Sequence, residues 1–172
     1  MAKTYLNEEN MRDIIWGATL MGGGGGGSIS SGMMLLDSYK KDHPDETLSV
    51  EMIDAGDMPE GTYAAATAGM GAPAAIAGVD FSAWAANAFA VLRDLAARDG
   101  KTLGYNYPVE LGGFSTFFPL MLSLKTGLPT VDCDGAGRAV PALETLLLNA
   151  PHLRWGWLMA TMIKSSLRWI IL

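Results

Sequence analysis

The sequence predicts an α/β domain in which helices flank a layered, mainly parallel sheet. Short stretches with the composition of β-strands alternate with longer stretches whose apolar residues recur every three or four positions, as in amphipathic helices. This alternation indicates a layered α/β structure. The 172 residues, 49% of them hydrophobic and 17% charged, are enough to bury one core.

Helix-capping residues mark the first two predicted helices. Asn7 is followed by two acidic residues and then by apolar residues at helical spacing. Ser28 precedes a second stretch of this kind. That helix is expected to end at His43, because a proline follows it and disfavours helical backbone in the residue before it.

The later helices carry similar signals. An alanine-rich stretch gives the clearest helix, with Ser82 as its N-cap and Gly100 just past its C-terminus. A short helix is expected within 112–128. A further helix is expected after Pro141, since proline suits a first helical position.

Loops rich in glycine follow three of the four predicted strands. The strands are expected within 48–53, 61–73, 101–110 and 130–134. The loops read "GMGAP", "ELGGFS" and "DCDGAGRAVP". Ligands of parallel α/β sheets bind at the loops that leave the carboxyl ends of strands, so we expect a small-molecule site there.

Composition and charge exclude other classes of protein. The net charge is -6 and Lys and Arg do not cluster, which argues against nucleic acid as a partner. No secretory signal and no apolar run of about 18 residues is visible, so a membrane span is not expected. The single cysteine, Cys133, excludes an internal disulfide. These features together predict a cytoplasmic protein.

Six consecutive glycines, Gly22–Gly27, separate the first two predicted helices; we call them the glycine run. They lack the lysine of a P-loop and follow a helix, so nucleotide binding is the weakest alternative. The run is either a flexible spacer or a structured loop that lets a ligand approach the backbone. Only 21 residues precede it, too few for a separate domain, which favours the structured loop. Its predicted substrate-binding residues are Gly23, Gly24, Gly25 and Gly26.

Two aspartates, Asp132 and Asp134, stand two residues apart in "DCDGAGRAVP". Such a pair can bind a divalent metal ion or act as an acid/base pair, with Arg138 neutralising it or holding the substrate. The alternative is an Asx turn in which Asp134 binds backbone N–H groups near Gly135. Cys133 lies between the aspartates and is expected to be a small buried residue rather than a nucleophile.

Glu110 directly follows the third predicted strand. A carboxylate there is a candidate general base, and the backbone N–H groups of Gly112 and Gly113 are candidate oxyanion-hole donors. The alternative is an ordinary acidic loop residue. Gly71 and Gly137, in the other two loops, complete the predicted substrate-binding residues.

The order of these motifs resembles the N-terminal domain of the S-methyl-thiohydantoin desulfurase-like family, over about residues 5–150. The most specific part is "GLPTVDCDGAGRAVP". The resemblance implies an α/β domain followed by a second, β-rich domain, and action on a five-membered cyclic imide or thio-imide with hydrolytic loss of methanethiol. Members often occur beside or fused to hydantoinase/oxoprolinase enzymes. The matching positions are Glu110, Gly112, Gly113, Asp132, Asp134, Gly137 and Arg138.

Two departures from the family pattern stand out. Ala142 follows Pro141 where members usually have an acid, and Glu144 comes two residues later. Residues 151–172 form an apolar tail that does not resemble the family's continuation, and the second, β-rich domain is expected to be absent. One hypothesis is that this tail is a truncated or frameshifted end.

Two functions follow as hypotheses. In the first, residues 1–150 form a hydrolase-type domain for a hydantoin-like ring, with Glu110 or the two aspartates activating water. In the second, the chain is a non-catalytic binding module that docks on a hydantoinase/oxoprolinase-type subunit. Self-association into a homo-oligomer stays open.

Overall fold

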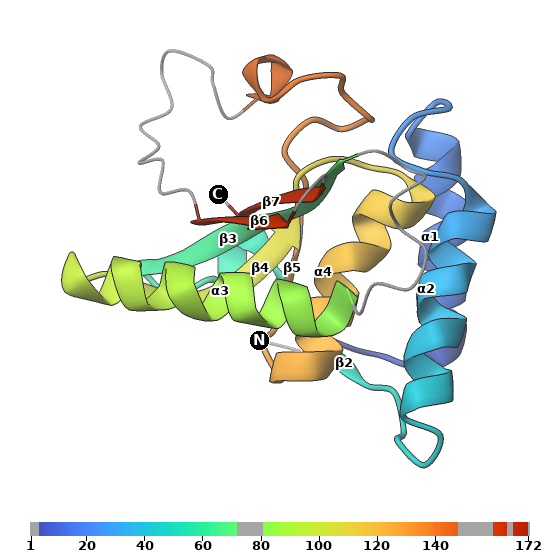
Figure 1. The fold of residues 1–172 in the computed structure, drawn as a ribbon, viewed down its shortest axis with the longest axis horizontal. Coiled ribbons are helices and arrows are strands. Elements are labelled where there is room, and N and C mark those ends of the chain that lie inside the picture. Colours follow the sequence, from blue (N-terminus) through green and yellow to red (C-terminus); the bar gives the residue numbers. More distant parts are fainter. Residues whose placement is uncertain (1–3, 72–80, 148–159, 165–166, 172) are drawn as a thin grey trace.

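A seven-stranded sheet organises the computed structural model, which describes residues 4–71, 81–147, 160–164 and 167–171 (Figure 1). Its order is β1-β2-β5-β4-β3-β7-β6. The central strands β2, β5, β4 and β3 are parallel, whereas β1 and the β7–β6 pair add antiparallel edges. The strands are Thr4–Leu6 (β1), Val50–Asp54 (β2), Thr62–Gly71 (β3), Thr102–Pro108 (β4), Thr130–Asp132 (β5), Ala160–Lys164 (β6) and Leu167–Ile171 (β7). The predicted parallel sheet is confirmed at its centre.

Four α-helices accompany the sheet in the described residues: Glu8–Met21 (α1), Ile29–Asp42 (α2), Phe81–Arg98 (α3) and Gly113–Thr126 (α4). Helix α4 packs on the sheet, and α1 and α2 pack against α4 (Figure 1). Helix α3 connects β3 to β4 and α4 connects β4 to β5, the crossovers that parallel neighbours require. None of the described helices combines the length and the apolar character that a membrane crossing requires.

The predicted caps form as expected at three helix ends. Asn7 and Asn10 exchange side-chain hydrogen bonds to each other's backbone N–H in a capping box, and Ser28 Oγ accepts from the N–H of Ser31. Gly100 has φ +71° and donates to the carbonyl of Ala97 in a Schellman motif that ends α3.

Two boundary predictions are wrong. Ser82 is not the N-cap of α3, because the helix already includes Phe81 and encloses Ser82 as a buried residue. Capping residues recur near helix starts, so their sequence fixes a boundary only to within one or two residues. Between Pro141 and residue 147 the chain forms a 3₁₀ turn, η3 (Leu143–Thr145), in place of the start of the predicted α-helix. The part of that predicted helix that falls within 148–159 lies outside the described residues. Another 3₁₀ turn, η1 (Ala55–Asp57), follows β2.

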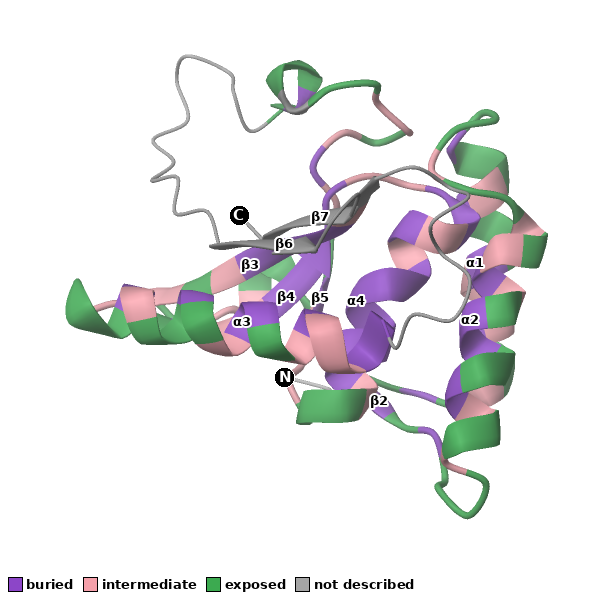
Figure 2. Ribbon diagram, in the orientation of Figure 1, coloured by how far each residue is buried: buried purple, intermediate pink, exposed green. Residues whose placement is uncertain are grey.

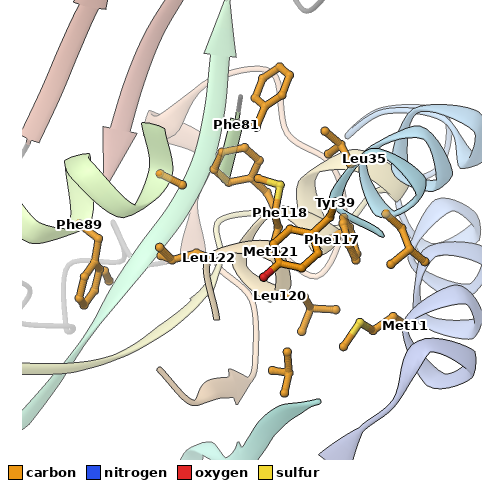
Figure 3. Close-up of a cluster of buried hydrophobic side chains, with 14 of the residues drawn as sticks. Met11, Leu35, Tyr39, Phe81, Phe89, Phe117, Phe118, Leu120, Met121 and Leu122 are labelled. Atoms are coloured by element: carbon orange, nitrogen blue, oxygen red, sulfur yellow. The ribbon is translucent and has the colours of Figure 1, made fainter. Parts of the chain in front are cut away.

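The main core lies between the helices and one face of the sheet (Figures 2 and 3). Helix α4 is enclosed by the sheet and by the other helices, so Phe117, Phe118 and Leu122 are fully buried. A second cluster includes Tyr107, Val131 and Leu146. Its strand residues alternate with those of the first cluster, which places it on the opposite face of the sheet.

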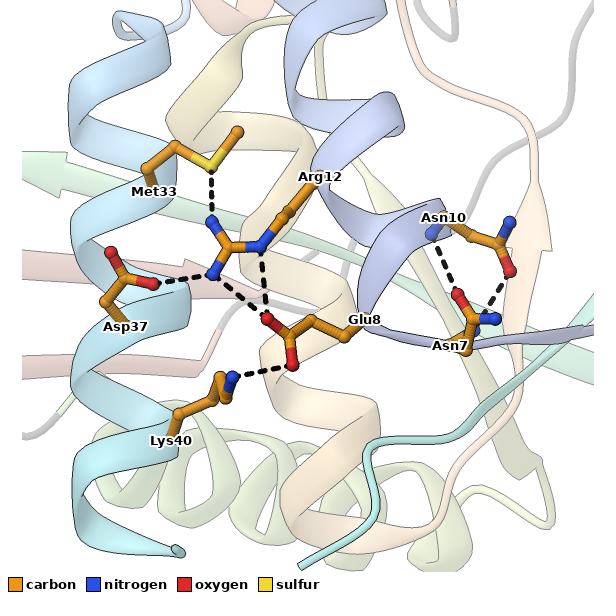
Figure 4. A network of polar contacts seen from close by, with 7 residues as sticks. All are labelled: Asn7, Glu8, Asn10, Arg12, Met33, Asp37 and Lys40. Atoms are coloured by element: carbon orange, nitrogen blue, oxygen red, sulfur yellow. Dashed lines mark hydrogen bonds and ion pairs between the residues drawn. The ribbon is translucent and has the colours of Figure 1, made fainter.

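A polar network joins α1 to α2 on the outer surface (Figure 4). Arg12 pairs with Asp37 of α2 at 2.9 Å and with Glu8 at 3.0 Å, while Lys40 Nζ lies 2.6 Å from the second oxygen of Glu8. Lys40 and then Arg12 lower the pKa of the Glu8 carboxyl. The pairs fix the two helices side by side, although exposed pairs of this kind contribute little stability.

Candidate ligand-binding site

The glycine run turns the chain from α1 to α2 and lies against the start of α4. The carbonyl of Gly26 accepts the N–H groups of Phe114 and Ser115 at 3.1 and 3.0 Å, and that of Gly27 accepts the N–H of Gly113 at 3.1 Å. The first N–H groups of a helix have no partner within the helix. The glycine run therefore caps α4.

Backbone meets backbone at this contact, which we call the glycine junction and define as Gly22–Gly27 with 111–113. A Cβ built on Gly26 would lie 2.3 Å from the carbonyl oxygen of Leu111, and one on Gly112 would lie 2.2 Å from that of Gly26. Gly26 also has φ +67°. Only glycine satisfies both constraints.

The junction changes the interpretation of the predicted oxyanion-hole donors. The N–H of Gly112 donates to Thr116 Oγ1 at 3.1 Å, and the N–H of Gly113 donates to the glycine run. These two groups are engaged within the protein, which contradicts the prediction that they are free to polarise a substrate carbonyl. Gly23 and Gly24 are exposed with open space beside them, whereas a Cβ on Gly25 would meet that of Ala139 at 2.6 Å.

Glu110 is half-buried and uses both carboxylate oxygens structurally. One oxygen accepts the hydroxyl of Ser115 in α4 at 2.9 Å, and the other accepts the N–H of Val140 at 2.7 Å. The carboxylate therefore joins the loop after β5 to the start of α4. Its role as a general base remains a prediction. Arg138 is exposed, donates from Nε to the carbonyl of Ala139, and among the described residues pairs with neither Asp132 nor Asp134.

The alternative of an Asx turn is confirmed at Asp134. Its Oδ1 accepts the N–H groups of Ala136, at 2.7 Å, and of Gly137. Cys133 is exposed, so the prediction of a buried residue is wrong. Its thiol is nevertheless partly enclosed, and desolvation, followed by the charges of Asp134 and Asp132, raises the pKa of Cys133 to about 11. A thiol with that pKa is protonated at neutral pH.

A pocket of about 380 Å³ lies between α1, α4 and the carboxyl ends of β4 and β5; we call it the strand-end pocket. Its apolar walls include Ile14 and Met21 of α1 and Leu120 of α4. Its polar groups are Thr116, Thr130, Asp132, Cys133 and Asp134. This is the edge of the sheet at which the sequence predicts a site.

Only part of the predicted site lies in this pocket. Asp132 and Asp134 line it, with Asp132 exposed and Asp134 half-buried. The other candidates are not part of its lining: Glu110, Arg138, Gly23–Gly26, Gly71, Gly112, Gly113 and Gly137. Gly71 lies at the end of β3. No group of three or more His, Cys, Asp or Glu side chains suited to a metal ion occurs among the described residues, so a divalent ion at the aspartates remains a hypothesis.

Most residues of the pocket lining were not predicted from the sequence, and Gly17, Thr130 and Thr116 are three of them. Gly17 lies in the middle of α1, where a glycine destabilises a helix and therefore signals a local need for space. Thr130 lies two residues before Asp132 on β5 and thus on the same face of the strand. Thr116 in α4 has no comparable sequence signal.

The fold and the pocket together define an α/β domain with a pocket at the carboxyl ends of its parallel strands. The chain belongs to the S-Me-THD-like family, because residues 9–164 match the model of that family's N-terminal domain. No curated protein matches the chain.

A solved structure with the same fold is the X-ray crystal structure of a protein from Chromobacterium violaceum, determined by a structural genomics consortium. It shares 31% sequence identity with a TM-score of 0.74. The similarity covers 83% of this chain but 38% of that protein, so the chain spans well under half of the length of this relative.

Proposed function

We propose that this chain supplies the ring-binding part of a hydrolase that acts on a five-membered cyclic imide or thio-imide, such as hydantoin or S-methyl thiohydantoin. The observation that carries the proposal is the strand-end pocket, which combines apolar walls with two carboxylates. Its volume of about 380 Å³ falls within the usual range for small-molecule pockets, about 300–1,000 Å³.

The chemistry assigned to the pocket is hydrolytic loss of methanethiol. The oxygen of a water molecule bonds to the ring carbon that carries sulfur, and the carbon–sulfur bond breaks. One proton of the water goes to the ring nitrogen and the other leaves with methanethiol, so the ring carbon becomes a carbonyl. Asp132 is the exposed carboxylate that would take up and pass on the first proton. Asp134 would hold the loop, since its Oδ1 is engaged in the Asx turn.

Obstruction of the pocket tests this proposal. Gly17 lines the pocket, and a Cβ there meets nothing within 4 Å, so Gly17→Phe places a ring in the cavity without distorting α1. We expect at least a tenfold loss of hydantoin and S-methyl thiohydantoin affinity by calorimetry. Leu20→Phe, on the same helix at an exposed position that does not line the pocket, is the matched control. Equal binding by both variants and the wild type would place the ring elsewhere.

Turnover gives the second arm of the test. Asp132→Asn keeps the size of the side chain but cannot take up a proton, so methanethiol release by the chain should be lost while ring binding persists.

Because the chain needs no disulfide, we place this activity in the cytoplasm as part of the proposal.

A second candidate function is a binding module that docks on a hydantoinase/oxoprolinase-type subunit. The observation that favours it is the side of α1 away from the pocket, where Trp16 and Leu20 are 60% and 82% exposed. Exposed apolar patches often mark interfaces. Co-elution with such a subunit that is abolished by Trp16→Glu, together with no methanethiol release, would favour this function over the first.

A further inference from the structure

A chain of buried polar side chains leads from the core to the strand-end pocket. Asn106 of β4 donates through Nδ2 to Ser123 Oγ of α4 at 2.8 Å, and Ser123 Oγ lies 2.8 Å from Thr130 Oγ1 of β5. All three residues are at most 4% exposed. Polar groups buried in an apolar core destabilise a protein unless hydrogen bonds satisfy them, and in this network Asn106 Oδ1 has no partner among the described residues.

The hydrogen bond between Ser123 and Thr130 allows either hydroxyl to be the donor. Ser123 Oγ accepts from Asn106, so its own hydroxyl proton can go to Thr130 Oγ1. In that arrangement Thr130 Oγ1 is the acceptor of the bond, and the hydroxyl proton of Thr130 has no acceptor within the described part of the chain. Thr130 also lines the pocket.

A second hydroxyl is arranged in the same way. Thr116 Oγ1 accepts the N–H of Gly112 at 3.1 Å, and among the described hydrogen bonds its proton has no acceptor. Thr116 also lines the pocket. When Ser123 donates to Thr130, the strand-end pocket thus offers two hydroxyl donors, from α4 and β5, together with the carboxylate acceptors Asp132 and Asp134.

We propose that Thr130, supported by Thr116, donates to a ring carbonyl oxygen while Asp132 accepts the neighbouring ring N–H. This inference rests on the proposed function and deepens it: Thr130 determines specificity for rings in which a carbonyl is adjacent to an N–H. A site whose buried donors have no internal acceptor rejects a ligand that lacks one, because the donors would be left unpaired.

The test compares two substitutions of Thr130 by calorimetry. Thr130→Val has nearly the same shape without the hydroxyl, and we expect it to lower hydantoin affinity about tenfold, as for one lost hydrogen bond of about 1.4 kcal/mol. Thr130→Ser keeps the hydroxyl and should stay within about twofold of the wild type. Thr126→Val removes a threonine hydroxyl of α4 that does not line the pocket, and should leave affinity unchanged.

A second ligand separates the two contacts. 1,3-Dimethylhydantoin keeps the carbonyls but has no N–H, so Thr130→Val should weaken both ligands by a similar factor. Asp132→Ala removes the acceptor of the ring N–H and should weaken the binding of hydantoin alone. Urea denaturation of each variant identifies losses of affinity that follow from unfolding, and the serine variant keeps the test valid if the valine variant is unstable.

Each outcome separates this inference from the proposed function. If hydantoin binds the wild type, fails to bind Gly17→Phe and binds Thr130→Val normally, the pocket is right and the role of Thr130 is overturned. If Gly17→Phe binds hydantoin normally, or the wild type binds neither ligand, the proposed function fails and the inference fails with it. Equal losses in Thr130→Ser and Thr130→Val would also overturn the inference, since the hydroxyl would then not matter.

Discussion

The glycine junction and the strand-end pocket differ in how their polar groups are used. At the junction, the carbonyls of Gly26 and Gly27 accept the N–H groups at the start of α4, and backbones touch with no space for a side chain. In the pocket, Gly17 faces open space, and the threonines Thr116 and Thr130 are part of the lining. Both regions contain glycines that sequence patterns associate with ligands, but of the two the pocket combines open space with hydroxyl and carboxyl side chains. Glycine alone therefore indicates close approach of the backbone, and the side chains around an open space indicate what can bind there.

The largest effect is expected from Gly26→Ala in the junction. Its Cβ would lie 2.3 Å from a backbone oxygen, and its positive φ adds strain, so we expect a loss of about 3 kcal/mol or more in the free energy of unfolding. Gly23→Ala is the control, because Gly23 has φ +63° but open space, and should lose about 1 kcal/mol. Urea denaturation measures both, and equal losses would show that the junction is not tightly packed.

The pocket's cysteine should react slowly despite its exposure. Because the pKa of Cys133 is raised to about 11, its thiolate fraction at pH 7 should be about a hundredfold below that of an unperturbed cysteine. Alkylation by iodoacetamide should be correspondingly slow and should accelerate as the pH rises towards 11. Asp134→Asn keeps a turn acceptor but removes a charge, so it should speed the reaction. Alkylation at the rate of free cysteine would contradict the partial enclosure of the thiol.

Glu110 belongs to the junction side of this comparison, because it does not line the pocket and its carboxylate holds the start of α4 to the loop after β5. Glu110→Ala removes the acceptor of two hydrogen bonds and should lower the free energy of unfolding by about 2 kcal/mol. Glu110→Gln keeps one acceptor oxygen, so about half of that loss is expected. Urea denaturation, with hydrogen exchange at the Val140 amide, measures the effect. A variant with full stability and no methanethiol release would instead support the general-base prediction.

The smallest effect is expected at Gly17. Its helical backbone and open surroundings allow Gly17→Ala to raise the free energy of unfolding by about 0.5–1 kcal/mol, the opposite sign from Gly26→Ala. Thermal or urea denaturation measures this gain. A destabilised Gly17→Ala protein would mean that α1 lies closer to the pocket's opposite wall than the structure shows.

Local signals predict the fold well, and tertiary contacts decide the site. The caps at Asn7, Ser28 and Gly100 depend on neighbouring residues alone, so the local sequence is enough to predict them. The Asx turn at Asp134 is equally local. The role of the glycine run is not local: whether its neighbour is a ligand or the 111–113 backbone depends on how α1 and α2 pack on α4.

For the same reason, the sequence predicts only some of the residues that line the pocket. Asp132 follows from its place at the end of a predicted strand. Gly17 and Thr116 enter the site because α1 and α4 lie together beside that strand end, and no spacing in the sequence shows this. Thr130 shares its strand face with Asp132, but its role depends on Ser123 and Asn106, which come from other elements.

Direct backbone contact at the glycine junction fixes the width of the neighbouring cavity. Helix α1, which supplies one wall, runs straight into Gly22, and Gly26 is held to the start of α4 with no side chain between them. Near the junction, the separation between the end of α1 and the start of α4 is thus set by contact between main chains rather than by side chains. Relatives that keep this contact would have a cavity of the same width. They could change which ligand they bind only through the residues that line the cavity.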